Sequence, residues 1–424
     1  MKISPARVGA FNVLLRIETE RAFSSILLPL YEKNLSSSDR SLCHELTLGT
    51  LRRQIYLDRL IDFCSSEKKL DAAVRVALRL GVYQLLFLDK IPEYSAVSES
   101  VNLVQLSKKT SAKGFVNAVL RRIAKEKPEP VSSDEIDRIS VETSHPRWLV
   151  EKWIGDFGFE ETVRLAAANN QISSHAFRLI DKDFQFDARR SEFVDGCYLT
   201  ARIGNDLILA AERGEIYFQD EGSQMTAASV QVSKNGSVLD VCAAPGGKTG
   251  MIALRNKADL KLCVAGDLHW KRVVNLSDNC RKQGVEEVKV VQYNAENPLP
   301  FADESFVSVL VDAPCSGTGT IRHNPEIRYS LTPTDIAELP LKQLRIIANA
   351  SKMVMRGGSL IYSTCSLETE ENESIGEKFL NENTDFRIVE PNVPERFITD
   401  KGFARTFPDR DNMDGFFIAE FRRF

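Results

Sequence analysis

From residue 237 onward, short apolar runs alternate with helical stretches, and this alternation constrains the fold more than any other feature of the chain. The runs are SVLDVC (237–242), LKLCVAGD (260–267), EVKVVQYN (287–294), SVLVDAPC (308–315) and SLIYSTC (359–365). They are rich in β-branched residues and nearly continuous, which is typical of strands buried on both faces of a parallel sheet. Helical stretches, such as 269–284 and 340–354, lie between them. The order predicts a doubly wound α/β fold whose ligands bind at the carboxyl ends of the strands.

The front of the chain is expected to be helical. In 41–64 and 71–88, Leu, Val and Ile recur at three- and four-residue steps. Residues 1–130 carry 21 Lys and Arg against 14 Asp and Glu, a balance of +7, so the rest of the chain, with 34 against 45, stands at −11. A basic front and an acidic back suggest that the first domain meets a polyanion, although a solvated helix surface explains the charge equally well. The basic residues beside the apolar stripes are Arg52, Arg53, Arg59, Lys108, Lys109, Lys113, Arg121 and Arg122.

The middle of the chain separates these two parts. KPEPVSSDE, Lys127–Glu135, is rich in proline, serine and charge, as in a linker. Residues from about 175 to 218, including LILAAERGEIYF (207–218), are expected to form short strands in a small α+β insert. We therefore predict three domains: an all-α domain over 1–130, a small α+β linker domain over 131–232, and an α/β domain over 233–424.

Composition excludes several other classes of protein. No apolar run approaches the length of a membrane span, and residues 1–20 lack the features of a signal peptide. Eight cysteines without paired spacing and only five histidines argue against a disulfide framework or a metal site. We expect a cytoplasmic protein that needs neither membrane nor metal.

The stretch DVCAAPGGKTG, Asp240–Gly250, follows the first predicted strand and resembles a phosphate-binding loop that lacks its first glycine, because Cys242 stands there. Glycines at a strand–helix turn let the backbone approach a ligand. The second strand ends in Asp267, about 20 residues further on, where an acid that binds ribose hydroxyls is expected. Loop and acid together suit an S-adenosylmethionine site. For the loop alone, a purely structural turn remains an alternative.

Two cysteines follow neighbouring strands on the expected ligand side. Cys315 comes after Asp312 and Pro314 at the end of the fourth strand, and Cys365 ends the fifth. Partly exposed thiols near a helix N-terminus and Lys248 can be poised as reactive thiolates. Three other cysteines are expected to be inert residues of the core: Cys242, Cys263 and Cys280.

Two resemblances give these patterns a context. PEYSAVSESVNL (92–103) followed by KGFVNAVLRRI (113–123) resembles the NusB-type RNA-binding helical domain, over nearly all of the first 127 residues. The glycine-rich loop, both cysteine motifs, HNPEIRY (323–329) and RTFPDRDNMDGFF (405–417) occur in the order found in RNA cytosine-5 methyltransferases. The whole chain resembles the RsmB (Fmu/Sun) family, which implies a Rossmann-like S-adenosylmethionine-dependent domain behind a NusB-like one.

The resemblance implies methyl transfer from S-adenosylmethionine to carbon 5 of a cytosine in 16S ribosomal RNA, through a covalent cysteine–cytosine adduct. Separately from the resemblance, we expect a monomer. The resemblance makes Cys365 the nucleophile and Cys315 the residue for product release. It places Asp312 against the cytosine ring and Lys248 where it affects charge near the cofactor or base, with a structural lysine as the alternative. The residues alone do not rank the thiols, and the Pro-Cys nucleophile of DNA cytosine-5 enzymes keeps the reverse assignment open.

For the cofactor, the resemblance implies Asp267 at the ribose, Asn294 near the adenine and Asp312 near the methionine moiety. The loop residues are Cys242, Ala243, Ala244, Pro245, Gly246, Gly247 and Lys248. The chain departs from the family twice. Asn294 replaces a common aspartate, and AFRLID (176–181) replaces an Arg-x-Asn pattern, which leaves one implied RNA contact in doubt.

Three rival functions follow from the same residues. An RNA-binding assembly factor with a degenerate methyltransferase fold would bind the cofactor without transferring methyl groups. An ATPase or GTPase is disfavoured by Cys242, and a DNA cytosine methyltransferase by the NusB-like front.

Overall fold

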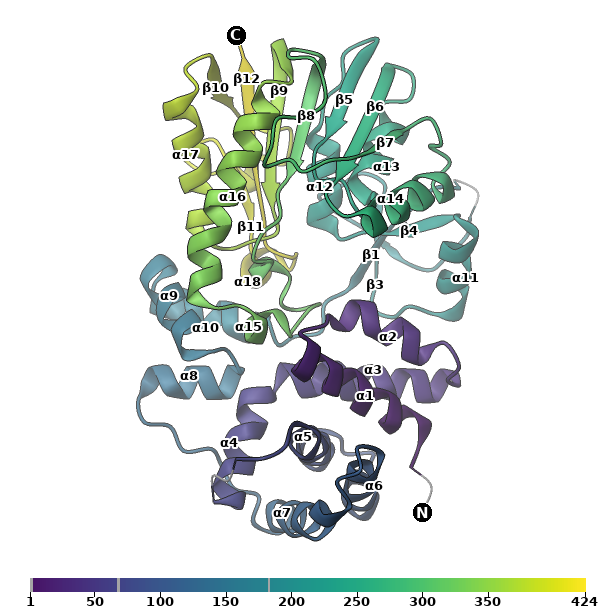
Figure 1. Ribbon diagram of the computed structural model, residues 1–424, viewed down its shortest axis with the longest axis vertical. Helices are drawn as coiled ribbons and strands as arrows, with labels where there is room; N and C mark the ends of the chain where they lie inside the picture. Colours follow the sequence, from purple (N-terminus) through teal and green to yellow (C-terminus); the bar gives the residue numbers. More distant parts are fainter. Residues whose placement is uncertain (1–2, 67–68, 182–183) are drawn as a thin grey trace. The chain divides into compact units, whose positions relative to one another are not determined.

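The computed structural model describes residues 3–66, 69–181 and 184–424 (Figure 1). The contacts within the chain divide it into two compact units. Unit 1 comprises Met1–Gln171 together with Ile321–Ser330, and unit 2 comprises Ile172–Thr320 together with Leu331–Phe424. Among the described residues, no helix is long and apolar enough to cross a membrane.

Unit 1 is helical, as its apolar spacing predicts. Its helices are α1 (Pro5–Glu20), α2 (Ser24–Glu32), α3 (Ser37–Arg52), α4 (Gln54–Ser65), α5 (Ala72–Phe87), α6 (Glu93–Leu106), η1 (Thr110–Ala112), α7 (Lys113–Glu126), α8 (Glu135–Thr143), α9 (Arg147–Phe157), α10 (Phe159–Ala168) and α15 (Ile327–Ser330). In α7 the residues at three- and four-residue steps, Val116, Val119, Leu120 and Ile123, are the buried ones. Such a stripe forms where one face of a helix packs on a core.

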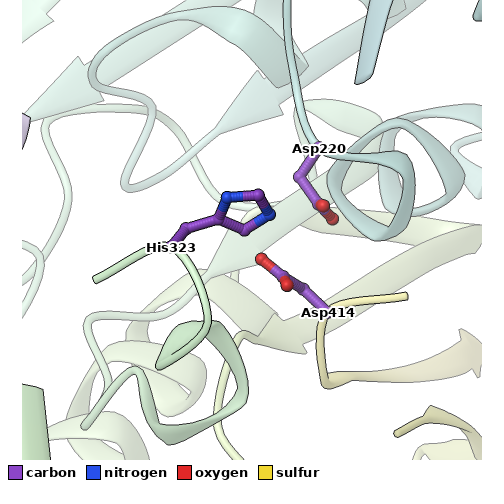
Figure 2. A group of neighbouring side chains, drawn as sticks. All are labelled: Asp220, His323 and Asp414. Carbon is purple, nitrogen blue, oxygen red and sulfur yellow. The ribbon is translucent and has the colours of Figure 1, made fainter. Parts of the chain in front are cut away.

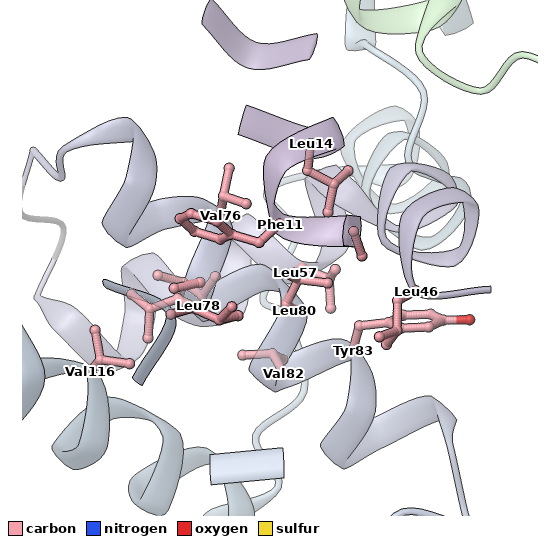
Figure 3. Packing of buried hydrophobic residues seen from close by; sticks show 14 of the residues in the cluster. Phe11, Leu14, Leu46, Leu57, Val76, Leu78, Leu80, Val82, Tyr83 and Val116 are labelled. Carbon is pink, nitrogen blue, oxygen red and sulfur yellow. The ribbon is translucent and has the colours of Figure 1, made fainter. Parts of the chain in front are cut away.

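The core of unit 1 draws side chains from helices that are distant in sequence (Figure 3). Phe11 of α1, Leu46 of α3, Leu57 of α4, Leu80 of α5 and Val116 of α7 belong to one buried cluster. Complete burial of a leucine or phenylalanine side chain stabilises a fold by about 2 kcal/mol, so this cluster holds the helices together.

Some of the basic residues in the first 130 residues form ion pairs within unit 1. Arg59 pairs with Asp137 at 2.9 Å, and Lys109 pairs with Asp71 at 2.8 Å. The pair of Lys109 and Asp71 is exposed, and such pairs stabilise a fold by less than about 1 kcal/mol. Asp137 is buried, but the side chains of both cations stay partly exposed.

The segment Ile321–Ser330, which carries the HNPEIRY sequence, belongs to unit 1 although its neighbours in sequence belong to unit 2. Arg328 is completely buried, and its Nη1 atom donates to Oδ1 of Asn170 at 3.0 Å. Glu326 accepts hydrogen bonds from the N–H and the hydroxyl of Ser24, at 2.7 and 2.8 Å. These contacts give the segment a structural role in the helical unit.

Unit 2 begins with a small antiparallel sheet in the order β2-β3-β1-β4. Its strands are β1 (His175–Leu179), β2 (Arg189–Arg190), β3 (Cys197–Thr200) and β4 (Ile216–Phe218). The prediction of strand over the first part of 207–218 was wrong, because Asn205–Arg213 form the helix α11. Leu207 and Ala210, three residues apart, are its buried positions, and Gly214 ends it with φ = 77°. The α+β character expected for this part of the chain is confirmed.

The large sheet of unit 2 has the order β10-β12-β9-β8-β5-β6-β7, with β11 paired to β12. Its strands are β5 (Gly236–Asp240), β6 (Leu260–Asp267), β7 (Lys289–Gln292), β8 (Phe306–Asp312), β9 (Val354–Thr364), β10 (Phe386–Val389), β11 (Ala404–Thr406) and β12 (Phe416–Arg423). The remaining helices are α12 (Glu221–Ser229), α13 (Gly247–Arg255), α14 (Trp270–Lys282), η2 (Thr318–Thr320), α16 (Pro333–Ser351), η3 (Thr369–Glu371), α17 (Glu373–Glu382), η4 (Glu395–Phe397) and α18 (Pro408–Asp411). Strands β5 to β9 are parallel, as predicted, whereas β12 is antiparallel to β9 and β10 to β12.

Both faces of the large sheet are buried, as the continuous apolar runs predict. Successive residues of a strand point to opposite faces. Leu239 of β5 packs in a cluster with residues of α16 and α17, whereas its neighbour Val238 packs with residues of α12 and α13. In β8, Val309 likewise packs in the cluster with α16 and α17, and its neighbour Leu310 packs in the cluster with α12 and α13. The doubly wound architecture is therefore confirmed.

The order of the strands locates the expected ligand crevice. From β5 the chain adds β6 and β7 on one side and then β8 and β9 on the other. The direction of winding reverses between β5 and β8, and ligands of doubly wound sheets bind at the carboxyl ends beside this point. The predicted site residues all lie at this edge of the sheet: Asp267 and Asp312 end β6 and β8, and the others lie in the loops after β5, β7, β8 and β9 or in the first turn of α13.

Candidate active site

The loop after β5 is a tight turn whose carbonyl groups are held by α14. Gly246 has φ = 104°, and a Cβ atom there would lie 2.9 Å from Leu276. Arg272 donates to the carbonyl oxygen of Ala244 at 2.8 Å, and Asn279 donates to that of Pro245 at 2.9 Å. The turn thus needs glycine, and it delivers the chain into α13 at Gly247.

Arg178 of β1 reaches the same loop from the small sheet. Its Nη2 atom donates to the carbonyl oxygen of Gly247 at 3.3 Å and to Oε1 of Gln283, and its Nε atom donates to Gln219 at 3.0 Å. Gln283 in turn donates to the carbonyl oxygen of Gly246 at 3.3 Å. Burial lowers the pKa of Arg178 to about 10. This arginine of the divergent AFRLID segment is therefore a buried support of the glycine-rich loop, a contact that sequence reasoning missed.

A cavity of about 250 Å³ opens at the carboxyl ends of the parallel strands. It brings together seven of the predicted site residues: Cys242, Ala244, Asp267, Asn294, Asp312, Cys315 and Cys365. Ala243, Pro245, Gly246, Gly247 and Lys248 belong to the loop but do not line this cavity. Cys263 and Cys280 are buried in the core as predicted, whereas Cys242 both packs against the core and lines the cavity.

One end of the cavity is formed by the residues after β6 and β7. The carboxylate of Asp267 is nearly buried, accepts from the N–H of His269 at 3.3 Å and lies 3.4 Å from Nη2 of Arg272. Oδ1 of Asn294 accepts from the N–H of Glu296 at 3.0 Å. The hydroxyl of Tyr293 is buried without a hydrogen-bond partner among the described residues.

Asp240, the last residue of β5, lies beneath the glycine-rich loop. Oδ2 of its carboxyl group accepts from the hydroxyl of Thr249 at 2.6 Å, while Oδ1 has no partner among the described residues. Burial raises the pKa of this carboxyl group to about 7, so that it is partly protonated at neutral pH.

Lys248 and Asp312 form an ion pair in the middle of the site. Nζ of Lys248 lies 2.8 Å from Oδ2 of Asp312, and the hydroxyl of Ser363 donates to Oδ1 at 2.9 Å. Burial acts to lower the pKa of Lys248, but the charge and hydrogen bond of Asp312 outweigh it, and the pKa is raised. The lysine is therefore a fixed cation, and Asp312 is anchored on both oxygens.

The two cysteines predicted to react lie in contact. The Sγ atoms of Cys315 and Cys365 are 3.3 Å apart, and both residues line the cavity. The hydrogen bond to Cys365, together with burial and the charges of Glu371 and Asp312, raises the pKa of the Cys315 thiol. Cys315 therefore holds its proton and can donate it towards the sulfur of Cys365.

Behind the cysteines lies Glu371, which sequence reasoning missed. Its carboxylate accepts from the N–H of Ser316 at 2.9 Å and from the hydroxyl of Ser366 at 2.8 Å. The only sequence signal is the acidic run ETEENE after the second cysteine, which does not differ from a solvated stretch of charge.

Within either unit, the described residues contain no group of three His, Cys, Asp or Glu side chains arranged to hold a metal ion. Figure 2 shows Asp220 and Asp414, which belong to unit 2, with His323, which belongs to unit 1. Asp220 has a structural role as the N-cap of α12, where it accepts from the N–H of Gly222 at 2.8 Å.

The doubly wound sheet, the glycine-rich turn after β5 and the acid that ends β6 define a Rossmann-like, S-adenosylmethionine-dependent methyltransferase domain. The family described as 16S rRNA methyltransferase RsmB/F matches residues 227–422, and the NusB family matches residues 4–125. The chain belongs to the RsmB/F family of methyltransferases, with a NusB domain in front.

Curated relatives agree with this assignment. The chain is 32% identical to the probable ribosomal RNA small subunit methyltransferase B of Bacillus subtilis, with both chains covered in full. It is also 32% identical to the ribosomal RNA small subunit methyltransferase B of Pseudomonas putida, with 88% of each chain covered.

Solved structures share the fold. The crystal structure of PH0851 is similar with a TM-score of 0.86 and 24% identity, and both chains are covered in full. NSun6 from Pyrococcus horikoshii with SFG is similar with a TM-score of 0.57 and 22% identity, over 66% of this chain and 98% of that one.

Proposed function

We propose that this protein transfers a methyl group from S-adenosylmethionine to carbon 5 of a cytosine in small-subunit ribosomal RNA, through a covalent adduct with Cys365. The contact of 3.3 Å between the thiols of Cys315 and Cys365 in the cavity carries this proposal. The relatives named as ribosomal RNA methyltransferases support the substrate class. The NusB domain, with the net charge of +7 over residues 1–130, supports RNA binding.

The cavity residues fit the cofactor. The carboxylate of Asp267 suits ribose hydroxyls, and the buried hydroxyl of Tyr293, which has no partner among the described residues, offers a further hydrogen bond. Leu268 and Ile346 give apolar surface for an adenine ring, with Asn294 beside them. When bound, the cofactor supplies an electrophilic methyl group.

Carbon 5 of cytosine is a poor nucleophile because the ring is electron-deficient. In the proposed mechanism, the Cys365 thiolate forms a bond to carbon 6, and the electron pair displaced from the 5,6 double bond gives carbon 5 the charge to take the methyl group. Asp312, held by Lys248 and Ser363, binds the ring near nitrogen 3 and its amino group. A flipped or single-stranded cytosine gives this access.

Release of the product requires that carbon 5 lose its proton to a water molecule acting as base, that the electron pair of the carbon–hydrogen bond restore the 5,6 double bond, and that the bond between carbon 6 and sulfur break. The electron pair of that bond then returns to Cys365 as thiolate. We assign Cys315 to this step, because its raised pKa keeps a proton that hydrogen-bonds to the leaving sulfur. With Cys315 in this role, we propose Cys365 as the nucleophile, which is the order that the family resemblance implies.

Nucleoside analysis tests the proposal. Small-subunit RNA that lacks the modification is incubated with the protein and S-adenosylmethionine, digested and analysed by mass spectrometry. We expect one 5-methylcytidine per RNA. Methylation at any other base atom, or cofactor binding without methylation, contradicts the proposal, and the second result favours an assembly factor. The three-domain division, the monomeric state and the cytoplasmic location stay predictions.

A further inference from the structure

One completely buried carboxylate touches the residue that follows each reactive cysteine. Glu371 stands at the end of η3 and has no exposed surface. Its Oε2 atom accepts from the backbone N–H of Ser316, directly after Cys315, and its Oε1 atom accepts from the hydroxyl of Ser366, directly after Cys365. The loops after β8 and β9 therefore share one anchor.

We propose that Glu371 is the positioning residue that sets the separation of the two thiols, by holding both cysteine turns on a single carboxylate. That the distance between the two Sγ atoms matters for catalysis rests on the proposed function. The distance itself can be tested without that function.

Further contacts fix the carboxylate and leave it little freedom. Nε2 of Gln343, on α16, donates to Oε2 of Glu371 at 2.8 Å and to the carbonyl oxygen of Pro314 at 3.0 Å. The hydroxyl of Tyr362 donates to the backbone carbonyl oxygen of Glu371 at 2.7 Å. Three donors thus converge on the side chain and a fourth holds the main chain, so that the anchor is rigid.

The two turns also touch one another beside this anchor. The hydroxyl groups of Ser316 and Ser366 lie 2.9 Å apart, and the N–H of Gly319 donates to the carbonyl oxygen of Cys365 at 3.0 Å. Without the carboxylate of Glu371, three donors would lose their acceptor in a buried place, and the turns would have to rearrange to satisfy them. A displacement of about 1 Å in a reacting group lowers a catalytic rate about 100-fold.

Glutamine at position 371 keeps the length of the side chain and removes its charge. Its carbonyl oxygen can accept from Ser316 and Gln343, and its amide can donate to the hydroxyl oxygen of Ser366. Glu371→Gln should therefore keep the thiols in place, whereas Glu371→Ala should not. Glu420→Ala is the matched control: Glu420 is also a buried carboxylate of unit 2, it accepts from the hydroxyl of Ser359 at 2.8 Å, and within the described part of the chain it makes no hydrogen bond to either cysteine turn.

The first readout needs no RNA. Each full-length protein is treated briefly with diamide, which oxidises two neighbouring thiols to a disulfide and is itself reduced to the hydrazine, and the peptides are mapped by mass spectrometry. We expect the disulfide between Cys315 and Cys365 to form at similar rates in the wild type, Glu371→Gln and Glu420→Ala. In Glu371→Ala it should form about tenfold more slowly or less efficiently. Single-turnover methyl transfer should follow the same order.

Wild-type rates of disulfide formation and methyl transfer in Glu371→Ala would overturn the proposal, and so would equal losses in Glu420→Ala. If Glu371→Ala does not fold, Ser366→Ala removes one of the bonds to the carboxylate and should slow disulfide formation about threefold; an unchanged rate overturns the proposal. A disulfide that depends on Glu371 in a protein that methylates no RNA would support the positioning role and contradict the proposed function.

Discussion

The ammonium group of Lys248 lies 2.8 Å from Oδ2 of Asp312 and joins the first turn of α13 to the end of β8. Only 13% of the lysine side chain is exposed. Removing one partner of such a pair leaves the other as a poorly solvated, uncompensated charge. The pair therefore links the cofactor loop to the carboxylate that we assign to the cytosine ring.

Lys248→Met is expected to lower the single-turnover rate of methyl transfer by about 10- to 100-fold, because Asp312 loses the cation that orients it. Binding of S-adenosylmethionine, measured by calorimetry, should change less than about threefold. Lys342→Met is the control, since Lys342 lines the same cavity but pairs with Glu296. Equal rates for the two variants would contradict the role of Lys248.

Asp240 should make stability depend on pH. Its pKa is raised from 3.8 to about 7 on folding, so between these values the folded state keeps a proton that the unfolded state has lost. The stabilisation is complete below about pH 4 and is lost as the pH rises through 7. Relative to Asp240→Asn, the free energy of unfolding of the wild type should fall by about 3 kcal/mol between pH 5 and pH 8.

Urea unfolding of both proteins at the two pH values checks this prediction. The exposed Asp278, paired with Arg281, provides the control. Relative to Asp278→Asn, the free energy of unfolding of the wild type should hardly change between pH 5 and pH 8. If the free energies of unfolding of the wild type and Asp240→Asn differ by the same amount at pH 5 and pH 8, the carboxyl group of Asp240 is ionised in the folded protein.

Arg178→Ala should weaken binding of S-adenosylmethionine about tenfold, since the carbonyl group of Gly247 and the side chain of Gln283 lose the cation that holds them. A hydrogen bond to a charged group contributes about 1.5–3 kcal/mol, and about 1.4 kcal/mol is tenfold in affinity. Calorimetric titration measures the change, with the exposed Arg213→Ala as control. Unchanged affinity in Arg178→Ala would restrict this arginine to the stability of the small sheet.

Asn294→Asp should tighten binding of S-adenosylmethionine by a few-fold. The amide already accepts from the N–H of Glu296 through Oδ1, and a carboxylate keeps that bond while its second oxygen accepts from an adenine amino group. Calorimetric measurement of the dissociation constant of S-adenosylmethionine for the wild type and for Asn294→Asp tests this prediction. Weaker binding by the aspartate would mean that Asn294 donates through its amide.

Much of the site could be predicted because its residues follow consecutive buried strands. Asp267, Asp312 and Cys365 each stand at or next to a strand end, and parallel strands place such ends at one edge of a sheet. Helix α11 was missed because LILAAERGEIYF also fits an alternating strand pattern, and only Gly214 marks the helix end.

Other features depend on contacts that no local pattern encodes. Glu371 and Gln343 meet only when η3 and α16 pack together, and an acidic run gives no sign that one member is buried. The segment Ile321–Ser330 keeps the family order in sequence while its contacts belong to the helical unit. The antiparallel strand β12 pairs with β9 although β10 and β11 lie between them in sequence, and its residues Phe417 and Phe421 are buried in the core.

The most direct test of the whole account is a denaturing gel. Cys315→Ala and Cys365→Ala proteins are each incubated with S-adenosylmethionine and unmodified small-subunit ribosomal RNA. The account predicts a denaturant-stable protein–RNA adduct with Cys315→Ala, which can attack but not release, and none with Cys365→Ala. An adduct only with Cys365→Ala would exchange the two roles, and the absence of any adduct together with no methyl transfer by the wild type would contradict covalent catalysis by this protein.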